Sequence, residues 1–184
     1  MAVPSIEEAE HMDINTILMR ATFKIAGQAT LGTAFVLGRP VPADSSRVYY
    51  VLVTAAHVLR EIKEEQAVLF LRKKQNDEFV KFPWPLHLRN GNQELWKEHP
   101  KADVAVMYVK MPPEADIQLL PISCLASDED LNGFEIHPGD TLSCLGYPFG
   151  AEADKAGFPI LRSGQIASYL LCLDPHAAVR IMRL

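Results

Sequence analysis

The chain has 184 residues, of which 48% are hydrophobic and 22% are charged, and its formal net charge is −5. This length and composition fit one folded domain, or two small ones that share an interface. The acidic balance argues against nucleic acid as a main partner, because neutralising phosphates requires a basic face. The three consecutive cations at positions 72–74 are expected to form a solvated turn.

The N-terminal residues have neither the basic start nor the apolar stretch of a secretory signal. No segment of the sequence is apolar for long enough to span a membrane, so we expect no membrane contact. The three cysteines, Cys124, Cys144 and Cys172, are odd in number and widely spaced. This pattern favours reduced thiols over a disulfide framework and predicts a cytoplasmic protein.

Residues 1–19 are expected to form an N-terminal arm or helix, since Ser5 and Glu8 fit a capping box. A short helix is predicted over residues 55–62. The predicted strands of the following region cover residues 22–25, 34–37, 48–54, 67–71, 79–84 and 104–109. Pro83 and Pro85 favour a sheet edge for the fifth of these strands. Many short strands with little helix predict an all-β fold, a small barrel or sandwich.

A second unit is expected after the proline pair of residues 111–113. It would contain a linker, residues 117–138, and two more strands, residues 141–145 and 160–169. Two or three strands cannot close a barrel and leave open edges. The predicted organisation is an arm (1–19), a first β-barrel (20–113), and a linker with a partial second β-barrel (114–184).

Two positions carry residues typical of acid–base chemistry. His57 lies where a buried strand meets the short helix, in residues 53–58 (Val-Thr-Ala-Ala-His-Val), and Asp103 opens an apolar strand. Taken singly, each fits a structural role, because most buried histidines are simply hydrogen-bonded and strand-start aspartates are often exposed turn residues. A buried carboxylate needs a partner, and a histidine N–H is a good one.

The order and spacing of several segments resemble the trypsin-like, chymotrypsin-fold serine proteases. Thr-Ala-Ala-His, which ends at His57, is followed 46 positions later by Asp-Val-Ala-Val, which begins at Asp103. Residues 32–37 (Gly-Thr-Ala-Phe-Val-Leu) match the strand that precedes the histidine in the family. Residues 145–150 and 162–168 are similar to the Gly-x-Pro-x-Gly turn and the next strand of bacterial high-temperature-requirement members. The resemblance covers roughly residues 20–170 and implies a trypsin-like double β-barrel whose second barrel is incomplete.

The resemblance also implies a mechanism. His57 would act as general base and then general acid, while Asp103 would orient the imidazole and stabilise its charged form. The partner would be a polypeptide substrate or a peptide ligand. Within the family, the sequence resembles most the bacterial intracellular trypsin-like peptidases. The resemblance implies no cofactor.

The nucleophile of the family is absent from the expected place. Its Gly-[Asp/Asn]-Ser-Gly-Gly string does not occur, and only 81 residues follow Asp103, where roughly ninety separate aspartate and serine in the template. Ser163 is followed by one glycine, but it lacks the glycine before it and the second glycine after it, and it is rejected. Ser143 and Cys144 are expected to be packed inside an apolar strand. Cys172 lacks the glycine context of the cysteine variants of this fold.

No metal site is expected, because Cys172 and His176 are separated by Pro175 and no second ligand pair accompanies them. The remaining histidines are interpreted as ordinary surface residues: His11, His87, His99 and His137. As written, the chain is expected to be an inactive serine endopeptidase domain. The alternatives are a non-catalytic pseudoprotease that binds peptides, or a truncated, non-functional product with exposed apolar residues such as Leu170, Leu171 and Ile181.

Overall fold

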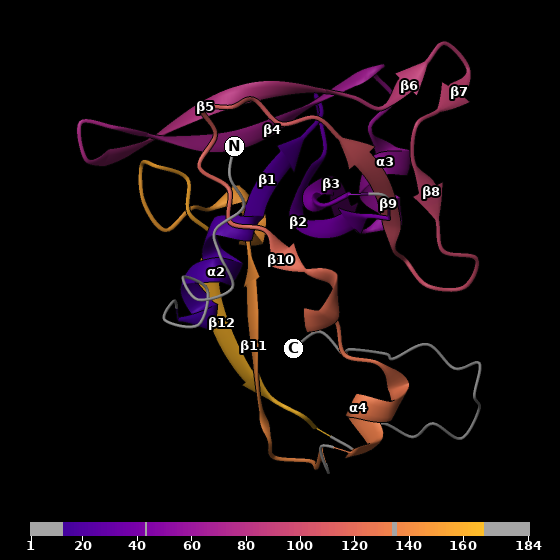
Figure 1. Cartoon of the computed structure of the whole chain (residues 1–184), viewed down its shortest axis with the longest axis vertical. Helices are drawn as coiled ribbons and strands as arrows, with labels where there is room; N and C mark the ends of the chain where they lie inside the picture. Colours follow the sequence, from indigo (N-terminus) through magenta and orange to yellow (C-terminus); the bar gives the residue numbers. More distant parts are fainter. Residues whose placement is uncertain (1–12, 43, 134–135, 168–184) are drawn as a thin grey trace.

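The computed structural model describes residues 13–42, 44–133 and 136–167 (Figure 1). The strands are β1 (Thr22–Ala26), β2 (Leu31–Val41), β3 (Asp44–Thr54), β4 (Gln66–Gln75), β5 (Glu78–His87), β6 (Arg89–Asn90), β7 (Gln93–Glu94), β8 (Lys97–Glu98), β9 (Ala105–Val109), β10 (Leu120–Pro121), β11 (Thr141–Gly146) and β12 (Ile160–Gln165). The helical segments are α2 (Ile14–Ala21), α3 (Ala56–Glu61), η1 (Ile122–Cys124), α4 (Asp128–Gly133) and η2 (Pro148–Gly150). The architecture is mostly β, in agreement with the predicted class.

One large sheet has the strand order β5-β4-β1-β2-β3-β9-β8, and β10 pairs in parallel with β2 (Figure 1). β5 lies at one end of this order, as its prolines predict, because a proline supplies no N–H to a ladder. In the part of the chain that the structure describes, no pairing joins β5 to β8, the strands at the two ends of this order. The ladder is therefore open along the described residues, whereas a complete first barrel was expected.

The core lies on the face of the large sheet that carries Phe23, Val36, Leu52 and Leu69, all with no exposed side-chain surface. α3 adds Leu59 to this cluster. Burying side chains of this size contributes about 1.5–3 kcal/mol each. This core gives the large sheet the apolar support that a stable fold requires.

A second, smaller cluster covers the other face of β2 and β3. There α2 packs Ile17 and Ala21 against Leu37, Val53 and Leu120. The central strands thus have a buried residue on each face, which explains their nearly continuous apolar sequence. The first half of β3 is less buried than the second. Tyr49 in that half is 45% exposed and packs edge-on against Tyr108. The expectation that the whole of residues 48–54 is buried is therefore wrong for its first half.

β11 and β12 form a separate two-stranded antiparallel ribbon that runs below the large sheet in Figure 1. Most of its side chains are exposed, including those of Leu142 and Leu161. Ser143 and Cys144, expected to be packed, are exposed as well. The reason is that a two-stranded ribbon has no second layer of its own to cover its faces.

The remaining expectations divide between described and undescribed residues. α2 lies at the end of the predicted arm, while Ser5, Glu8 and His11 are outside the described residues. The predicted linker contains β10, η1 and α4. Also outside the described residues are Leu170, Leu171, Cys172, His176 and Ile181. Along the described part of the chain, no helix has the length and apolar character needed to cross a membrane.

Candidate functional site: a histidine–aspartate pair

His57 is presented by the junction of β3 and α3. β3 ends at Thr54, whose hydroxyl donates a hydrogen bond to the backbone oxygen of Thr33 at 2.8 Å. The short helix then buries Ala56 and Val58 against the core. Because neighbouring positions of a helix face different directions, His57 points away from that core, and 45% of its side chain is exposed.

Asp103 lies in the turn between β8 and β9. His99 closes this turn, since its Nδ1 accepts hydrogen bonds from the backbone N–H of Lys101 at 3.2 Å and of Ala102 at 2.8 Å. The N–H of His99 also bonds to the oxygen of Val104 at 2.8 Å. His99 is exposed, as expected, but it has a specific structural role in shaping the segment that carries Asp103.

Strand pairing brings the two segments to the same end of the sheet. Thr54, the last residue of β3, is paired with Ala105, the first residue of β9. His57 comes three residues after Thr54, and Asp103 comes two residues before Ala105. A separation of 46 positions in sequence is thereby reduced to direct contact.

The pair is joined by two hydrogen bonds. The distance between His57 Nδ1 and Asp103 Oδ2 is 2.5 Å, and the backbone N–H of His57 donates to Asp103 Oδ1 at 2.8 Å. These bonds, the side-chain bond first and the backbone bond second, hold the pKa of the Asp103 carboxyl below its usual range. The aspartate is consequently ionised at neutral pH.

This arrangement selects one tautomer of the histidine. An ionised carboxylate only accepts hydrogen bonds, so Nδ1 of His57 must carry a proton and donate the hydrogen bond to Asp103. In the neutral ring Nε2 then has a free lone pair and can accept a proton. His57 can therefore act as a general base, and its hydrogen bond to Asp103 keeps the imidazole ring oriented.

No serine or cysteine side chain of the described residues is hydrogen-bonded to His57. Ser163 lies on β12, where it is paired with Ser143 of β11. Cys124 and Cys144 are free and exposed. Nor do the described residues contain a group of three His, Cys, Asp or Glu side chains that could hold a metal ion.

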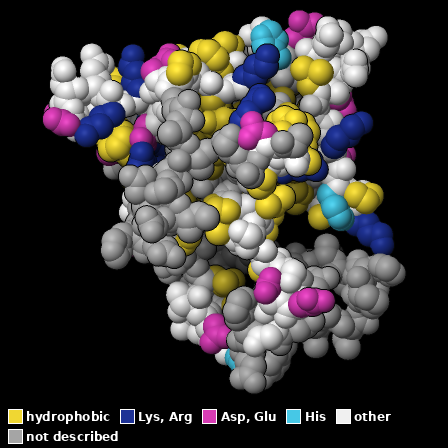
Figure 2. Space-filling model, in the orientation of Figure 1, with side chains coloured by type: hydrophobic (Ala, Val, Ile, Leu, Met, Phe, Trp, Pro, Cys, Tyr) yellow, Lys and Arg dark blue, Asp and Glu magenta, His cyan; other side chains and the backbone are white. Residues whose placement is uncertain are grey.

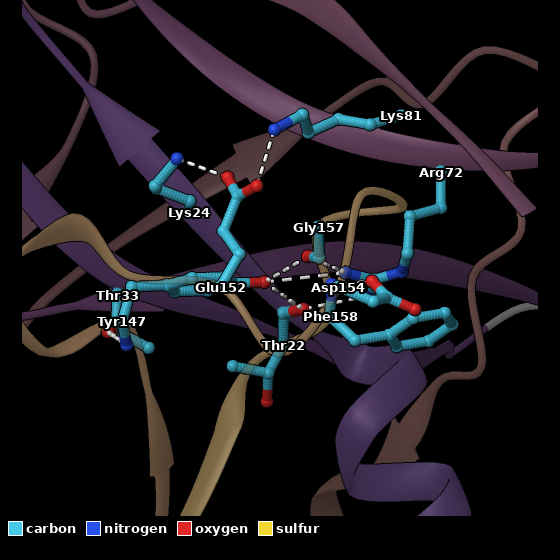
Figure 3. Close-up of polar contacts among 10 residues, drawn as sticks. All are labelled: Thr22, Lys24, Thr33, Arg72, Lys81, Tyr147, Glu152, Asp154, Gly157 and Phe158. Carbon is cyan, nitrogen blue, oxygen red and sulfur yellow. Dashed lines mark hydrogen bonds and ion pairs between the residues drawn. The ribbon is translucent and has the colours of Figure 1, made fainter.

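A second polar cluster surrounds Arg72, which the run of cations had suggested to be solvated. That interpretation is wrong for Arg72, because it is completely buried. Figure 3 shows Arg72 beside Tyr147, Gly157 and Phe158. Its guanidinium donates to the backbone oxygens of Met19 (3.1 Å), Arg20 (3.4 Å), Thr22 (2.9 Å) and Gly157 (3.0 Å), and to the Tyr147 hydroxyl (3.4 Å). It also lies between the rings of Phe23 and Phe158, 4.6 and 4.5 Å from their centroids.

Arg72 fastens residues 147–159, named the strap here, to the large sheet. Burial raises the pKa of Tyr147 to about 12, so its hydroxyl keeps its proton and donates to the oxygen of Gly157 at 2.9 Å. A second contact is made by Glu152, which forms ion pairs with Lys24 and Lys81 (Figure 3). Burial raises the pKa of Glu152, but the hydrogen bonds from the two lysines outweigh it and the net shift is downward.

The sequence contains little that could have revealed this cluster. Arg72 follows five apolar residues in β4, and a cation that ends an apolar run is ordinarily solvated. Its partners Tyr147 and Gly157 are 75 and 85 positions away. Only the folded arrangement supplies the carbonyl oxygens and rings that make the burial of its charge tolerable.

Two hollows are lined by residues other than His57 and Asp103. An apolar pocket of about 250 Å³ is lined by residues of α2, β2, β10 and the β11–β12 ribbon. An open bowl of about 590 Å³ lies beside β6, β7 and β8. Figure 2 shows charged side chains of both signs scattered over the face in view.

No family model, curated protein or solved structure matches this chain. Function must therefore be inferred from the residues and their geometry.

Proposed function

We propose that this chain is the histidine- and aspartate-bearing part of a trypsin-like serine endopeptidase. The observation that carries the proposal is the double hydrogen bond between His57 and Asp103, which leaves Nε2 of the imidazole free. The order of the matching sequence segments supports the same family. Together they provide the general base of the acyl-transfer mechanism and the group that orients it.

In this mechanism His57 Nε2 takes the proton of a serine hydroxyl as the serine oxygen bonds to the peptide carbonyl carbon. The imidazolium, stabilised by Asp103, then gives that proton to the departing amine as the C–N bond breaks. Water repeats the sequence and releases the acid, which regenerates the serine. We assign the serine to polypeptide outside the described residues.

The proposed fold is a trypsin-like double β-barrel. Strands β1–β5 and β9 with their common core would correspond to the first barrel, and the β11–β12 ribbon to the beginning of an incomplete second barrel. The substrate would be a polypeptide. The free, exposed thiols of Cys124 and Cys144 support a reducing, cytoplasmic location.

The test begins with the source DNA, read in all three frames for about 150 bases beyond the Leu184 codon. A Gly-[Asp/Asn]-Ser-Gly-Gly string in any frame would allow the longer product to be expressed. That product should react with a fluorophosphonate probe and cleave a fluorogenic peptide. Both activities should be lost in His57→Ala and retained in His87→Ala, a matched change at an exposed histidine on β5.

Absence of the string, or labelling that does not depend on His57, would contradict the proposal. Peptide binding by the 184-residue chain that survives His57→Ala would then indicate the pseudoprotease alternative. Aggregation with strong binding of an apolar dye would indicate a non-functional product.

A further inference from the structure

The surroundings of Asp103 contain one more charged contact, made by a residue that the family resemblance does not assign. Arg60 lies three positions after His57 in α3, so both side chains project from the same side of the helix. Arg60 Nη2 is 3.5 Å from Asp103 Oδ1, and Arg60 Nε is 3.0 Å from Glu98 Oε1. One guanidinium therefore contacts two carboxylates.

The two carboxylates belong to one hairpin. Glu98 lies on β8, where it is paired with Ala105 of β9, and Asp103 lies in the turn that joins these strands. Arg60 thus bridges the hairpin to the helix that carries His57. Its planar fork suits two acceptors at once, which a lysine ammonium cannot bridge with the same geometry.

Asp103 has few other restraints. Half of its side chain is exposed, and its carboxylate contacts only His57 and Arg60 among the described residues. Glu98 reaches it through Arg60, and His99 and Lys101 flank it within its own turn. Without Arg60, only the His57 backbone N–H would hold Oδ1, water would compete for that oxygen, and the carboxylate could rotate away from the imidazole.

We propose that Arg60 is a positioning residue, which holds the Asp103 carboxylate in line with His57 by anchoring the β8–β9 hairpin to α3. Glu98 completes the device by keeping the guanidinium from turning into solvent. The inference rests on the proposed function, because it assigns Arg60 a role in preparing the same general base.

The experiment uses NMR on the 184-residue chain and needs no hydrolysis. Two quantities are measured: the pH midpoint of the Asp103 side-chain carbon, and the solvent-exchange rate of the His57 Nδ1 proton. In Arg60→Gln we expect the Asp103 midpoint to rise, because a cation beside it is lost. We expect the exchange to become about threefold faster, the scale of an exposed ion pair.

Further variants separate charge from geometry. Arg60→Lys should retain most of the Asp103 midpoint but not the slow exchange, because lysine keeps the charge and loses the fork. Glu98→Gln should speed the exchange without raising the Asp103 midpoint. Arg39→Gln, at another exposed arginine whose side chain contacts Tyr108, is the matched control and should change neither quantity.

The Glu152 carboxylate, held by Lys24 and Lys81, serves as an internal reference. Unchanged Asp103 and His57 signals in Arg60→Gln would overturn the inference, as would an equal shift of the Glu152 midpoint, which would indicate general loss of structure. The two proposals can fail separately. Changed signals with no His57-dependent hydrolysis in the longer product would contradict only the function, and the reverse result would contradict only the role of Arg60.

Discussion

The molecule contains two polar clusters that differ in their relation to solvent. Arg72 is fully buried, and its guanidinium is surrounded by carbonyl oxygens and aromatic rings (Figure 3). His57 and Asp103 are each about half exposed, and the imidazole keeps one nitrogen free. The comparison teaches that a buried group with several hydrogen-bond acceptors around it holds elements together, whereas an exposed pair with one open position is available for chemistry.

The largest effect is expected on the exposed cluster, in activity and not in stability. Asp103→Asn in the longer product should lower the peptidase rate by about 10⁴, the loss seen in the serine-protease template when the aspartate becomes an amide and the wrong tautomer is favoured. The free energy of unfolding should fall by no more than about 1 kcal/mol, the scale of an exposed ion pair. Peptide hydrolysis and urea unfolding measure the two quantities.

Asp77→Asn is the matched control for this change. Asp77 lies in the exposed turn between β4 and β5, with a φ of 64°, a conformation that asparagine adopts readily. The peptidase rate of Asp77→Asn should equal that of the wild-type protein. A peptidase that kept its full rate in Asp103→Asn would break the proposed division of roles.

The next largest effect is expected at the buried cluster. Arg72→Met should reduce the free energy of unfolding by about 2–4 kcal/mol, because several buried carbonyl oxygens lose their donor. The measurement is urea denaturation followed by fluorescence. Lys74→Met, two positions along the same strand but exposed, should change stability by less than about 0.5 kcal/mol. Equal losses of stability in Arg72→Met and Lys74→Met would contradict the conclusion that Arg72 is buried and structural while Lys74 is solvated.

A smaller loss of stability is expected when the charge of Glu152, the second contact of the strap, is removed. Glu152→Gln should cost about 1–2 kcal/mol, because two part-buried lysines, Lys24 and Lys81, lose a charged acceptor. Glu94→Gln is the control, since Glu94 is half exposed and its ion pair with Arg89 is 4.0 Å long. Hydrogen exchange should show the change first in the strap, and an unchanged strap would contradict its attachment through Glu152.

The smallest effect is the acid dependence of stability. The folded-state pKa values of Glu152 and Asp103 lie below their ordinary values of 4.5 and 3.8. In acid the unfolded chain therefore binds more protons than the folded one, and the stability that these groups contribute is present above those ordinary values. It should be lost as the pH falls from about 4.5 through the folded pKa values.

Urea midpoints between pH 7 and pH 3 measure this loss. Glu152→Gln should flatten the decrease in stability at acid pH. A wild-type midpoint independent of pH below 4.5 would contradict the assigned ionisation of both carboxyls.

Local sequence patterns determined much of the secondary structure. Alternating or continuous apolar runs located β1, β3, β4 and the short helix that carries His57, because these elements use their apolar faces to build one core. The prolines of β5 indicated its edge position. The resemblance to trypsin-like proteases singled out His57 and Asp103, two positions that the fold does bring into contact.

Other features arose only in the tertiary structure. Ser143 and Cys144 read as buried, but no second layer of described residues covers their ribbon. Arg72 read as solvated, but the strap and α2 enclose it, and Arg60 gave no signal until the β8–β9 hairpin lay beside α3. By itself the sequence determined which elements form and which residue types can do acid–base chemistry, since both depend on near neighbours in the chain. Tertiary structure decided which charges are buried and which partners they meet, because those contacts join segments far apart in sequence.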